Sequence, residues 1–134
     1  MIYLKTEEEI ELLRRSNDLL GRTLAEIAKV IRPGVTTADL DKVAYEFICD
    51  HGGKPSCLGY EGFPATLCTS VNEQVVHGIP SNKVVLKDGG RLNSLNAILR
   101  EVWSHLVEYE CCNTLVLIVG THSNKQQIKI GHLL

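Results

Sequence analysis

The sequence has no long hydrophobic run, no block of positive charge and no start that resembles a secretory signal. Its longest apolar run, Leu115–Val119, is far shorter than the roughly 20 residues that span a bilayer. The N-terminus runs from Met1 into Glu7–Glu9 with neither a basic start nor an apolar segment of signal length. Lysine and arginine are dispersed, and the net charge is −2. These absences argue against a membrane protein, and they argue against a surface that follows nucleic-acid phosphates.

Cysteine is present without the spacing that builds a zinc site or a disulfide framework. The count is odd, and no two cysteines form a C-x-x-C pair. Reduced thiols are the simplest interpretation, and they predict a cytoplasmic location. The five residues are Cys49, Cys57, Cys68, Cys111 and Cys112.

The chain has 134 residues, of which 44% are apolar and 22% charged, as expected for one globular domain. Thr6 is a candidate helix cap, with Glu9 three residues later completing a capping box. Apolar residues then recur at helical spacing until Pro33-Gly34, which predicts one long helix. A second helix is expected from a cap at Thr36 or Thr37 to the glycines after His51. Its apolar stripe comprises Leu40, Val43, Ala44, Phe47 and Ile48.

Between Lys54 and Lys87 the pattern changes to short runs of β-forming residues separated by glycine and proline. Three strands are predicted there, at Ala65–Val71, Gln74–His77 and Val84–Leu86. The predicted fold class is therefore α/β (α+β), with two helices followed by a meander of short antiparallel strands.

Residues 90–134 have a different character. Leucine, isoleucine and valine fall at helical spacing from Leu92 to Leu106, which predicts a helix. Thr114–Val119 is a candidate strand, and Lys125–Leu134 is expected to be loose.

The residues with chemical potential lie on the glycine-punctuated loops between the expected strands. Cys57, Tyr60, Phe63 and Cys68 are soft or aromatic side chains that could line a small apolar pocket. His77 precedes a Gly-Ile-Pro turn, where its imidazole could exchange a proton near neutral pH. The alternative is that the cysteines and aromatics are simply core and that the histidine is structural.

Four segments of the sequence carry a stronger signal together than any one residue. They are Ile31–Asp41, Cys57–Pro64, Ser70–Pro80 and Leu86–Gly89. In order, spacing and residue identity they resemble the bacterial type I methionine aminopeptidases, over residues 1–89. The resemblance implies the N-terminal half of a pita-bread fold and an enzyme that removes the N-terminal methionine of nascent polypeptides with two divalent ions of cobalt, manganese, iron or zinc.

The resemblance also implies roles for individual residues. Cys57, Tyr60 and Cys68 match positions that line the pocket for the methionine side chain, and Phe63 falls where many members of the family carry tyrosine. His77 matches the histidine that hydrogen-bonds near the scissile amide, which makes it the one expected catalytic residue. Two metal ions sharing a hydroxide would supply the nucleophile in the whole enzyme.

The resemblance ends abruptly after Gly89. The family continues with an aspartate-containing strand that supplies metal ligands, whereas this sequence has no aspartate after Asp88. Glu101 and His105 are four residues apart, but without a third ligand they are a weak metal signal. No metal-ligand residue is therefore assigned, and no metal is expected to bind to this chain itself.

Two regions are therefore expected: residues 1–89, the N-terminal half of an aminopeptidase domain, and residues 90–134, a divergent tail. A frameshift, a gene rearrangement or a sequencing error near Gly90 would explain the change, and a genuine short protein with a new tail is the alternative. Half of a sheet leaves an edge that could self-associate.

Three functional hypotheses remain open from the sequence. The first is a methionine aminopeptidase by family whose metal ligands are missing from this chain, so that the chain alone is not expected to be active. The second is a non-catalytic module that binds peptide N-termini or a partner protein. The third is an inert fragment.

Overall fold

The computed structural model describes residues 4–75, 77–97, 99–100, 115–122 and 125–132, and it describes only the backbone of residue 91 and of those beyond 92. Two helices come first along the chain and are followed by short strands and one 3₁₀ turn. The elements are α1 (Glu7–Val30), α2 (Thr37–Asp50), β1 (Lys54–Pro55), η1 (Tyr60–Gly62), β2 (Leu67–Val71), β3 (Arg91–Ala97), β4 (Leu99–Arg100), β5 (Leu115–His122) and β6 (Lys125–His132).

Both helices begin at a capping box: the one at Thr6 and Glu9 is confirmed, and at α2 the cap is Thr36, one of the two residues expected, with Asp39 completing a box that was not predicted. The Glu9 N–H donates to Thr6 Oγ1 at 3.2 Å, and the Thr6 N–H donates to Glu9 Oε2 at 2.7 Å. At α2 the Asp39 N–H donates to Thr36 Oγ1 at 3.1 Å, and the Thr36 N–H donates to Asp39 Oδ2 at 2.9 Å. Each box satisfies N–H groups that the first helical turn would otherwise leave unpaired. Neither of the two described helices has the length and apolar character needed to cross a membrane.

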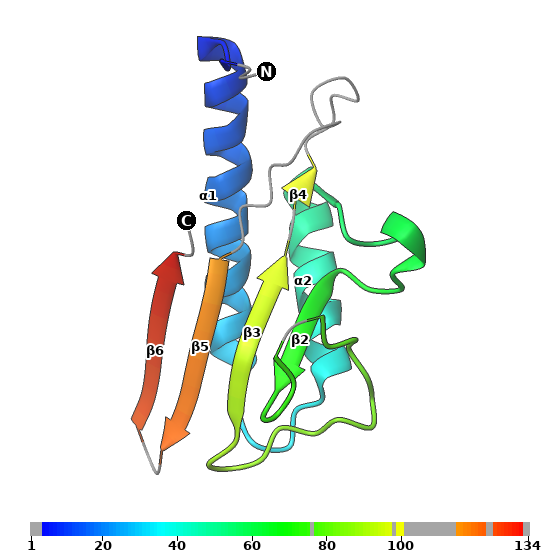
Figure 1. Ribbon diagram of the computed structural model, residues 1–134, viewed down its shortest axis with the longest axis vertical. Coiled ribbons are helices and arrows are strands. Elements are labelled where there is room, and N and C mark those ends of the chain that lie inside the picture. The colour runs from blue at the N-terminus through cyan, green and yellow to red at the C-terminus, as the bar shows by residue number, and fades with distance from the viewer. Residues whose placement is uncertain (1–3, 76, 98, 101–114, 123–124, 133–134) are drawn as a thin grey trace.

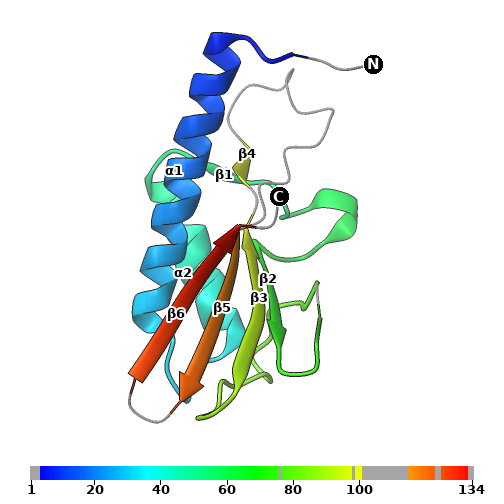
Figure 2. The same cartoon turned by 60° about the vertical axis from the view of Figure 1, so that its left-hand side comes forward.

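The main sheet has four antiparallel strands in the order β2-β3-β5-β6. Figures 1 and 2 show α1 and α2 on the same face of this sheet. A second, two-stranded ladder pairs β1 with β4, with Lys54 opposite Arg100. Strand β6 lies at one edge of the main sheet and, among the described strands, pairs with β5 alone.

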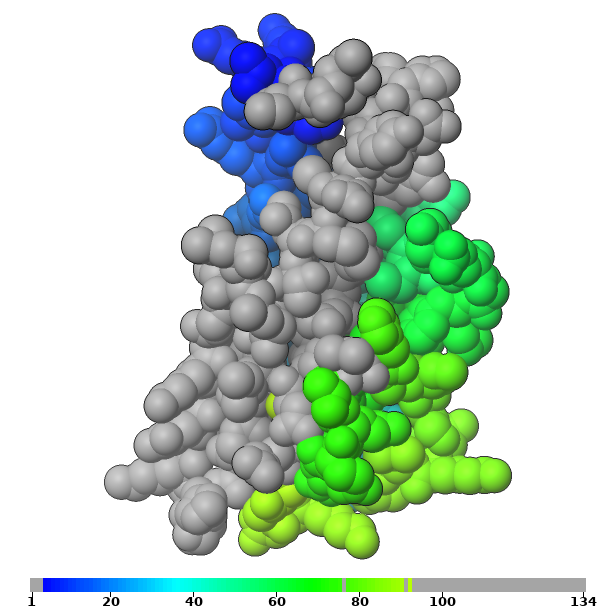
Figure 3. Space-filling model, in the orientation of Figure 1, coloured from blue at the N-terminus to red at the C-terminus, as the bar shows by residue number. Residues whose placement is uncertain are grey.

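The hydrophobic core lies between the two helices and the β2–β3 side of the sheet. Its buried residues are Leu20, Leu24, Ile27, Ile31, Leu40, Ala44, Leu67, Leu86 and Leu92. The turn after β1, by contrast, projects from the edge of the molecule as the green segment of Figure 3. Strand β2 is therefore held by the core, while Leu58 and Tyr60 on the turn after β1 are exposed.

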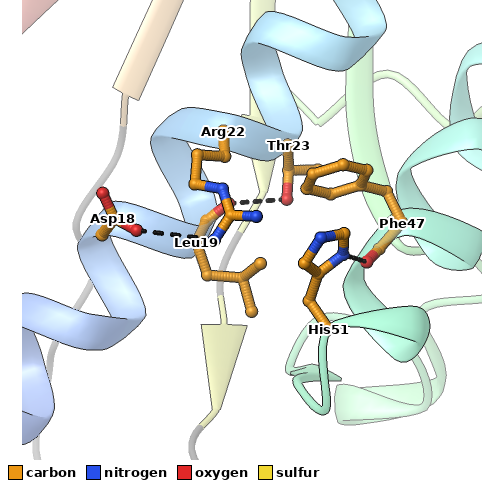
Figure 4. Close-up of polar contacts among 6 residues, drawn as sticks. All are labelled: Asp18, Leu19, Arg22, Thr23, Phe47 and His51. Carbon is orange, nitrogen blue, oxygen red and sulfur yellow. Dashed lines mark hydrogen bonds and ion pairs between the residues drawn. The ribbon is translucent and has the colours of Figure 1, made fainter.

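The faces of α1 and α2 also meet through polar and aromatic groups, which Figure 4 shows. The guanidinium carbon of Arg22 lies 5.9 Å from the centre of the Phe47 ring. At the C-terminal end of α2 the Phe47 and His51 rings stack with centroids 4.1 Å apart, and His51 Nδ1 lies 2.8 Å from the Phe47 carbonyl oxygen. Asp18 pairs with Arg22 from the preceding turn at 3.7 Å. This stack adds a cation–π contact to the apolar packing of the helix pair.

Asp41 joins α2 to the start of β2. Its Oδ1 accepts hydrogen bonds from the Thr66 N–H at 2.9 Å and from the Leu67 N–H at 2.7 Å. Thr66 and Leu67 are both buried, at 1% and 0% exposed, so water does not replace these bonds in the folded protein. A single carboxylate oxygen therefore fixes where β2 begins relative to the helix.

The mixed α/β class is confirmed, and so are both helices and the strand at Ala65–Val71. The strand expected at Gln74–His77 is wrong for the described positions, which form a turn and irregular chain. At Val84–Leu86 a single bridge links Val85 to Thr36 in place of a strand. The hydrogen bonds of this segment go to the loop between the two helices, with the Gly34 N–H donating to Leu86 O at 2.9 Å and the Leu86 N–H to Val35 O at 2.8 Å.

The tail differs more from expectation. The helix expected over Leu92–Leu106 is wrong at its start, where β3 runs antiparallel to β2 with Asn96 opposite Cys68. Strand β4 contradicts it at 99–100, and residues 101–106 lie outside the described residues. The edge of β2 offers main-chain hydrogen bonds, and this tertiary pairing outweighs a helical spacing of leucines. The strand at Thr114–Val119 is confirmed from Leu115 onward, whereas the loose segment expected from Lys125 is wrong because β6 occupies it.

Removing a core side chain should destabilise the protein. Leu40 is 0% exposed, so Leu40→Ala should lower the free energy of unfolding by about 2–5 kcal/mol in a urea titration. Leu4 is 89% exposed, and Leu4→Ala should change the same quantity by less than about 0.5 kcal/mol. Equal effects of the two substitutions would contradict the placement of α2 in the core.

Asp41 and Asp39 should respond to pH with opposite signs. Burial raises the pKa of Asp41, and its two backbone donors oppose that rise without cancelling it. The contribution of Asp41 to stability is therefore fully present below its unfolded pKa and is lost as the pH rises through its folded pKa. Relative to the parent protein, Asp41→Asn should become more stable as the pH rises from about 3 to about 7 in urea titrations.

Asp39→Asn is the matched control. Hydrogen bonds from the side chain and backbone of Thr36 lower the pKa of Asp39, so its contribution is present above the unfolded pKa and is lost as the pH falls. The stability of Asp39→Asn relative to the parent should therefore decrease as the pH rises. A trend of the same sign in both variants would refute the burial of Asp41.

Candidate functional site

The turn that carries Cys57, Tyr60 and Phe63 is closed by its own main chain. The Tyr60 N–H donates to Cys57 O at 3.1 Å, and the Phe63 N–H donates to Tyr60 O at 2.8 Å. Gly59 closes the turn by donating to Phe63 O at 2.8 Å from a left-handed conformation with φ of 82°. The three side chains therefore belong to one compact loop. The Tyr60 ring is 68% exposed and Phe63 is half-buried, so the aromatic part of this loop is open to solvent.

Cys68 lies on β2 and contacts this loop. Its side chain is 7% exposed, while Cys57 is half-buried. A hydrogen bond to Cys57 raises the pKa of the Cys68 thiol far above its usual range, and burial raises it further. The negative charge of Asp41 acts in the same direction. Cys68 is therefore a protonated, buried thiol that contacts the loop through Cys57.

His77 is positioned from the other edge of β2. The Thr69 N–H donates to Gly78 O at 2.6 Å, and the Gly78 N–H donates to Ser70 Oγ at 3.2 Å. These bonds hold the backbone next to His77 against the strand. His77 itself has φ of +57°, a left-handed conformation that is uncommon for residues with a side chain, and its side chain is exposed. The imidazole of His77 is therefore exposed, and the next residue, Gly78, is bonded to the buried strand β2.

The structure brings some of the predicted site residues together and leaves others apart. Cys57 and Cys68 touch, and Tyr60 and Phe63 follow Cys57 on the same turn. His77 is tied to the middle of β2 through Gly78, and not through its imidazole. The loops after β1 and after β2 therefore flank one short strand, with soft and aromatic groups on one loop and the histidine on the other.

Two residues that support this site were given no role from the sequence. Asp41 is the last residue of the segment Ile31–Asp41. The only sign of its role in the sequence is that an acidic residue lies among the apolar positions of α2. Gly78 stands within Ser70–Pro80. A Cβ at Gly78 would lie 2.0 Å from the Thr69 carbonyl oxygen, so only glycine lets the loop approach β2 this closely.

The described residues do not supply a metal site. Among the residues that the structure describes, no group of three or more histidine, cysteine, aspartate or glutamate side chains could hold an ion. The carboxylate beside Cys68 is Asp41, whose Oδ1 already accepts two backbone hydrogen bonds. The donor set of a two-metal centre does not fit these residues, and Glu101 and His105 lie outside the described ones.

A side chain at position 78 should lower the stability of the protein. Gly78→Ala should lower the free energy of unfolding by roughly 1–3 kcal/mol, because the added methyl group meets the backbone of Thr69. Gly21 provides the control, since a Cβ there meets nothing within 4 Å and the position is inside α1. Gly21→Ala should raise the free energy of unfolding by up to about 1 kcal/mol. Equal stability of Gly78→Ala and the parent protein in urea would show that the loop does not depend on this contact.

Comparison with known proteins identifies the group to which the chain is related. It is 51% identical over 89 residues to the methionine aminopeptidase of Clostridium acetobutylicum, covering 66% of this chain and 36% of that protein. It is 35% identical over 130 residues to the methionine aminopeptidase of Haemophilus influenzae, covering 96% of this chain and 46% of that protein. The chain thus spans less than half of the length of these relatives.

Solved structures give the same result. The crystal structure of methionine aminopeptidase from Rickettsia prowazekii superposes with a TM-score of 0.70 at 37% identity, covering 74% of this chain and 39% of that one. The enzyme from Thermotoga maritima gives a TM-score of 0.69 at 36% identity, covering 75% and 41%. The predicted pita-bread relationship is confirmed at the level of the fold. The family model of metallopeptidase family M24 matches residues 11–132, and the chain therefore belongs to that family.

Proposed function

We propose that this chain recognises the N-terminal methionine of a polypeptide and represents the substrate-binding part of a metal-dependent methionine aminopeptidase. The relatives that match it at about half identity carry that name, and their similarity covers the stretch that contains Cys57, Cys68 and His77. The family membership supports a hydrolase. Because the match covers only 36% and 35% of these two relatives, substrate recognition is the part of their function that we propose for this chain.

The contact between Cys57 and Cys68 is the observation that carries the proposal. It places the turn after β1, which also carries Tyr60 and Phe63, next to β2, and we propose that these side chains together form the surface that receives the methionine side chain. A methionine thioether is polarizable and packs well against sulfur and aromatic rings. The raised pKa keeps Cys68 protonated, so an apolar side chain packed against it does not have to desolvate a thiolate.

His77 is proposed to contact the peptide backbone of the substrate. Its side chain is exposed, and its main chain is fixed to β2 by the neighbouring Gly78. An imidazole in this position can donate a hydrogen bond to a peptide carbonyl or accept one from an amide. In the whole enzyme such a group would stabilise charge near the scissile amide.

Hydrolysis is assigned to the whole family enzyme and not to this chain by itself. The metal pair supplies an activated hydroxide when it is bound. The described residues do not form such a centre, and the sequence has no aspartate after Asp88. Binding residues alone do not supply a nucleophile, so this chain is proposed to bind methionyl peptides without cleaving them.

A binding titration tests this proposal. The chain should bind a Met-Ala-Ser peptide saturably and prefer it by at least about tenfold over Lys-Ala-Ser, because an apolar surface disfavours a buried ammonium group. Tyr60→Ala should weaken Met-Ala-Ser binding by about tenfold, since an exposed aromatic ring loses its contact with the ligand. Tyr45→Ala is the control, because Tyr45 is 45% exposed on α2 and should leave binding unchanged.

The same preparation should release no methionine when Co²⁺, Mn²⁺ or Fe²⁺ is added. Release that His77→Ala abolishes would show that the chain is catalytic after all. A folded chain without saturable binding would instead refute substrate recognition and favour an inert fragment. Binding of the peptide that ignores its first residue would favour a general protein-binding module.

A further inference from the structure

We propose that Ser70 is a positioning residue for His77, because its buried hydroxyl group holds the peptide unit that joins His77 to Gly78. The hydroxyl oxygen accepts a hydrogen bond from the Gly78 N–H at 3.2 Å. This bond concerns the chain itself, whereas its effect on ligand binding rests on the proposed function. Ser70 acts only through the direction in which His77 presents its imidazole, and not by touching the ligand.

Gly78 is the point at which the loop after β2 is attached to the strand. Among the described residues of 72–79 it is the one that is buried, and its neighbours on either side are exposed. Two hydrogen bonds make the attachment: the Thr69 N–H donates to Gly78 O at 2.6 Å, and the Gly78 N–H donates to Ser70 Oγ. The first bond restrains the peptide unit after Gly78, and the second restrains the unit before it.

The peptide unit before Gly78 decides how His77 is oriented. Its plane turns with the ψ angle of His77, so a hydrogen bond to its N–H fixes that angle. His77 has φ of +57°, a region that a residue with a side chain occupies only when its surroundings restrain it. Gly78 does not provide the restraint by itself, because a glycine changes its own φ at little cost. The hydroxyl group of Ser70 supplies it from a side chain.

Burial prevents water from replacing Ser70 in this role. Ser70 is 0% exposed, and Gly78 is buried as well. Without the hydroxyl, the Gly78 N–H would be left unpaired in the interior, which is costly, or would turn toward another acceptor. That turn changes ψ of His77 and moves its imidazole. Ser70→Ala is therefore expected to redirect His77 while the main-chain pairing of β2 with β3 stays in place.

Amide hydrogen exchange, measured by NMR on the isotope-labelled full-length chain, tests the bond without any ligand. In Ser70→Ala the Gly78 N–H should exchange at least about tenfold faster than in the parent protein, because it loses its acceptor. The ring signals of His77 should shift in the same variant. Those of His51, at the end of α2, should not.

Thr23→Val is the matched control for the loss of a buried hydroxyl group. Thr23 is also 0% exposed, and its Oγ1 donates one hydrogen bond to Leu19 O at 2.8 Å. It lies on α1, so its replacement should leave the exchange of the Gly78 N–H and the ring signals of His77 unchanged. A loss of global stability alone would speed Gly78 exchange in both variants, and that outcome would overturn the proposal.

A double-mutant cycle on peptide binding tests whether Ser70 acts through His77. Ser70→Ala should raise the Kd for Met-Ala-Ser by about threefold to tenfold. In a His77→Ala background the same substitution should raise the Kd by less than about twofold, because the imidazole that it redirects is already absent. An equal further loss in that background would show that Ser70 supports binding by another route, which contradicts the positioning role.

The two measurements separate this inference from the proposed function. A parent chain that does not bind Met-Ala-Ser overturns the proposed function, while the Gly78 exchange and the His77 ring signals still decide whether Ser70 positions His77. Unchanged Gly78 exchange in a folded Ser70→Ala chain overturns the inference. If circular dichroism shows that Ser70→Ala does not fold, Ser70→Cys takes its place, because sulfur is a weaker acceptor. Faster Gly78 exchange in that variant supports the inference, and exchange equal to that of the parent overturns it.

Discussion

The fold depends on the position of one carboxylate. Asp41 projects from α2 and accepts both N–H groups at the entry of β2 through a single oxygen. The position of Cys68, one residue further along, follows from that attachment. The thiol of Cys68 in turn holds the loop that carries Cys57, and the main-chain bonds of Thr69 and Ser70 hold the loop that carries His77. A displacement of β2 on α2 would therefore move both sides of the candidate site at once.

The candidate site combines rigid and open parts. Residues 65–70 are all buried, so the strand between the two loops has little freedom. Tyr60 on the loop before this strand and His77 on the loop after it are both exposed. A fixed strand with exposed groups on either side is suited to ligand recognition, since binding then orders few residues. The chemistry of water activation requires a different set of groups, and among the described residues that set is absent.

The sequence predicts the parts of this structure that depend on neighbouring residues. Thr6 with Glu9 predicts the start of α1, and Thr36 is one of two expected caps of α2, because a helix cap lies within a few residues of chain. Cys57, Tyr60, Phe63, Cys68 and His77 are found by order and spacing, but their mutual contacts depend on long-range folding. The role of Asp41 requires Thr66 and Leu67, which are 25 and 26 residues away. The strand at Arg91–Ala97 is missed for the same reason, since its partner β2 is distant in sequence.

The pairing of β2 with β3 relies on the main chain. Antiparallel strands are joined by main-chain groups that every residue except proline possesses. The chain has no proline after Pro80, so any part of residues 90–134 can donate to such a ladder. The core reaches this region through Leu92, whose side chain is 3% exposed. Main-chain pairing therefore places β3 beside β2, and the side chain of Leu92 then attaches β3 to the core.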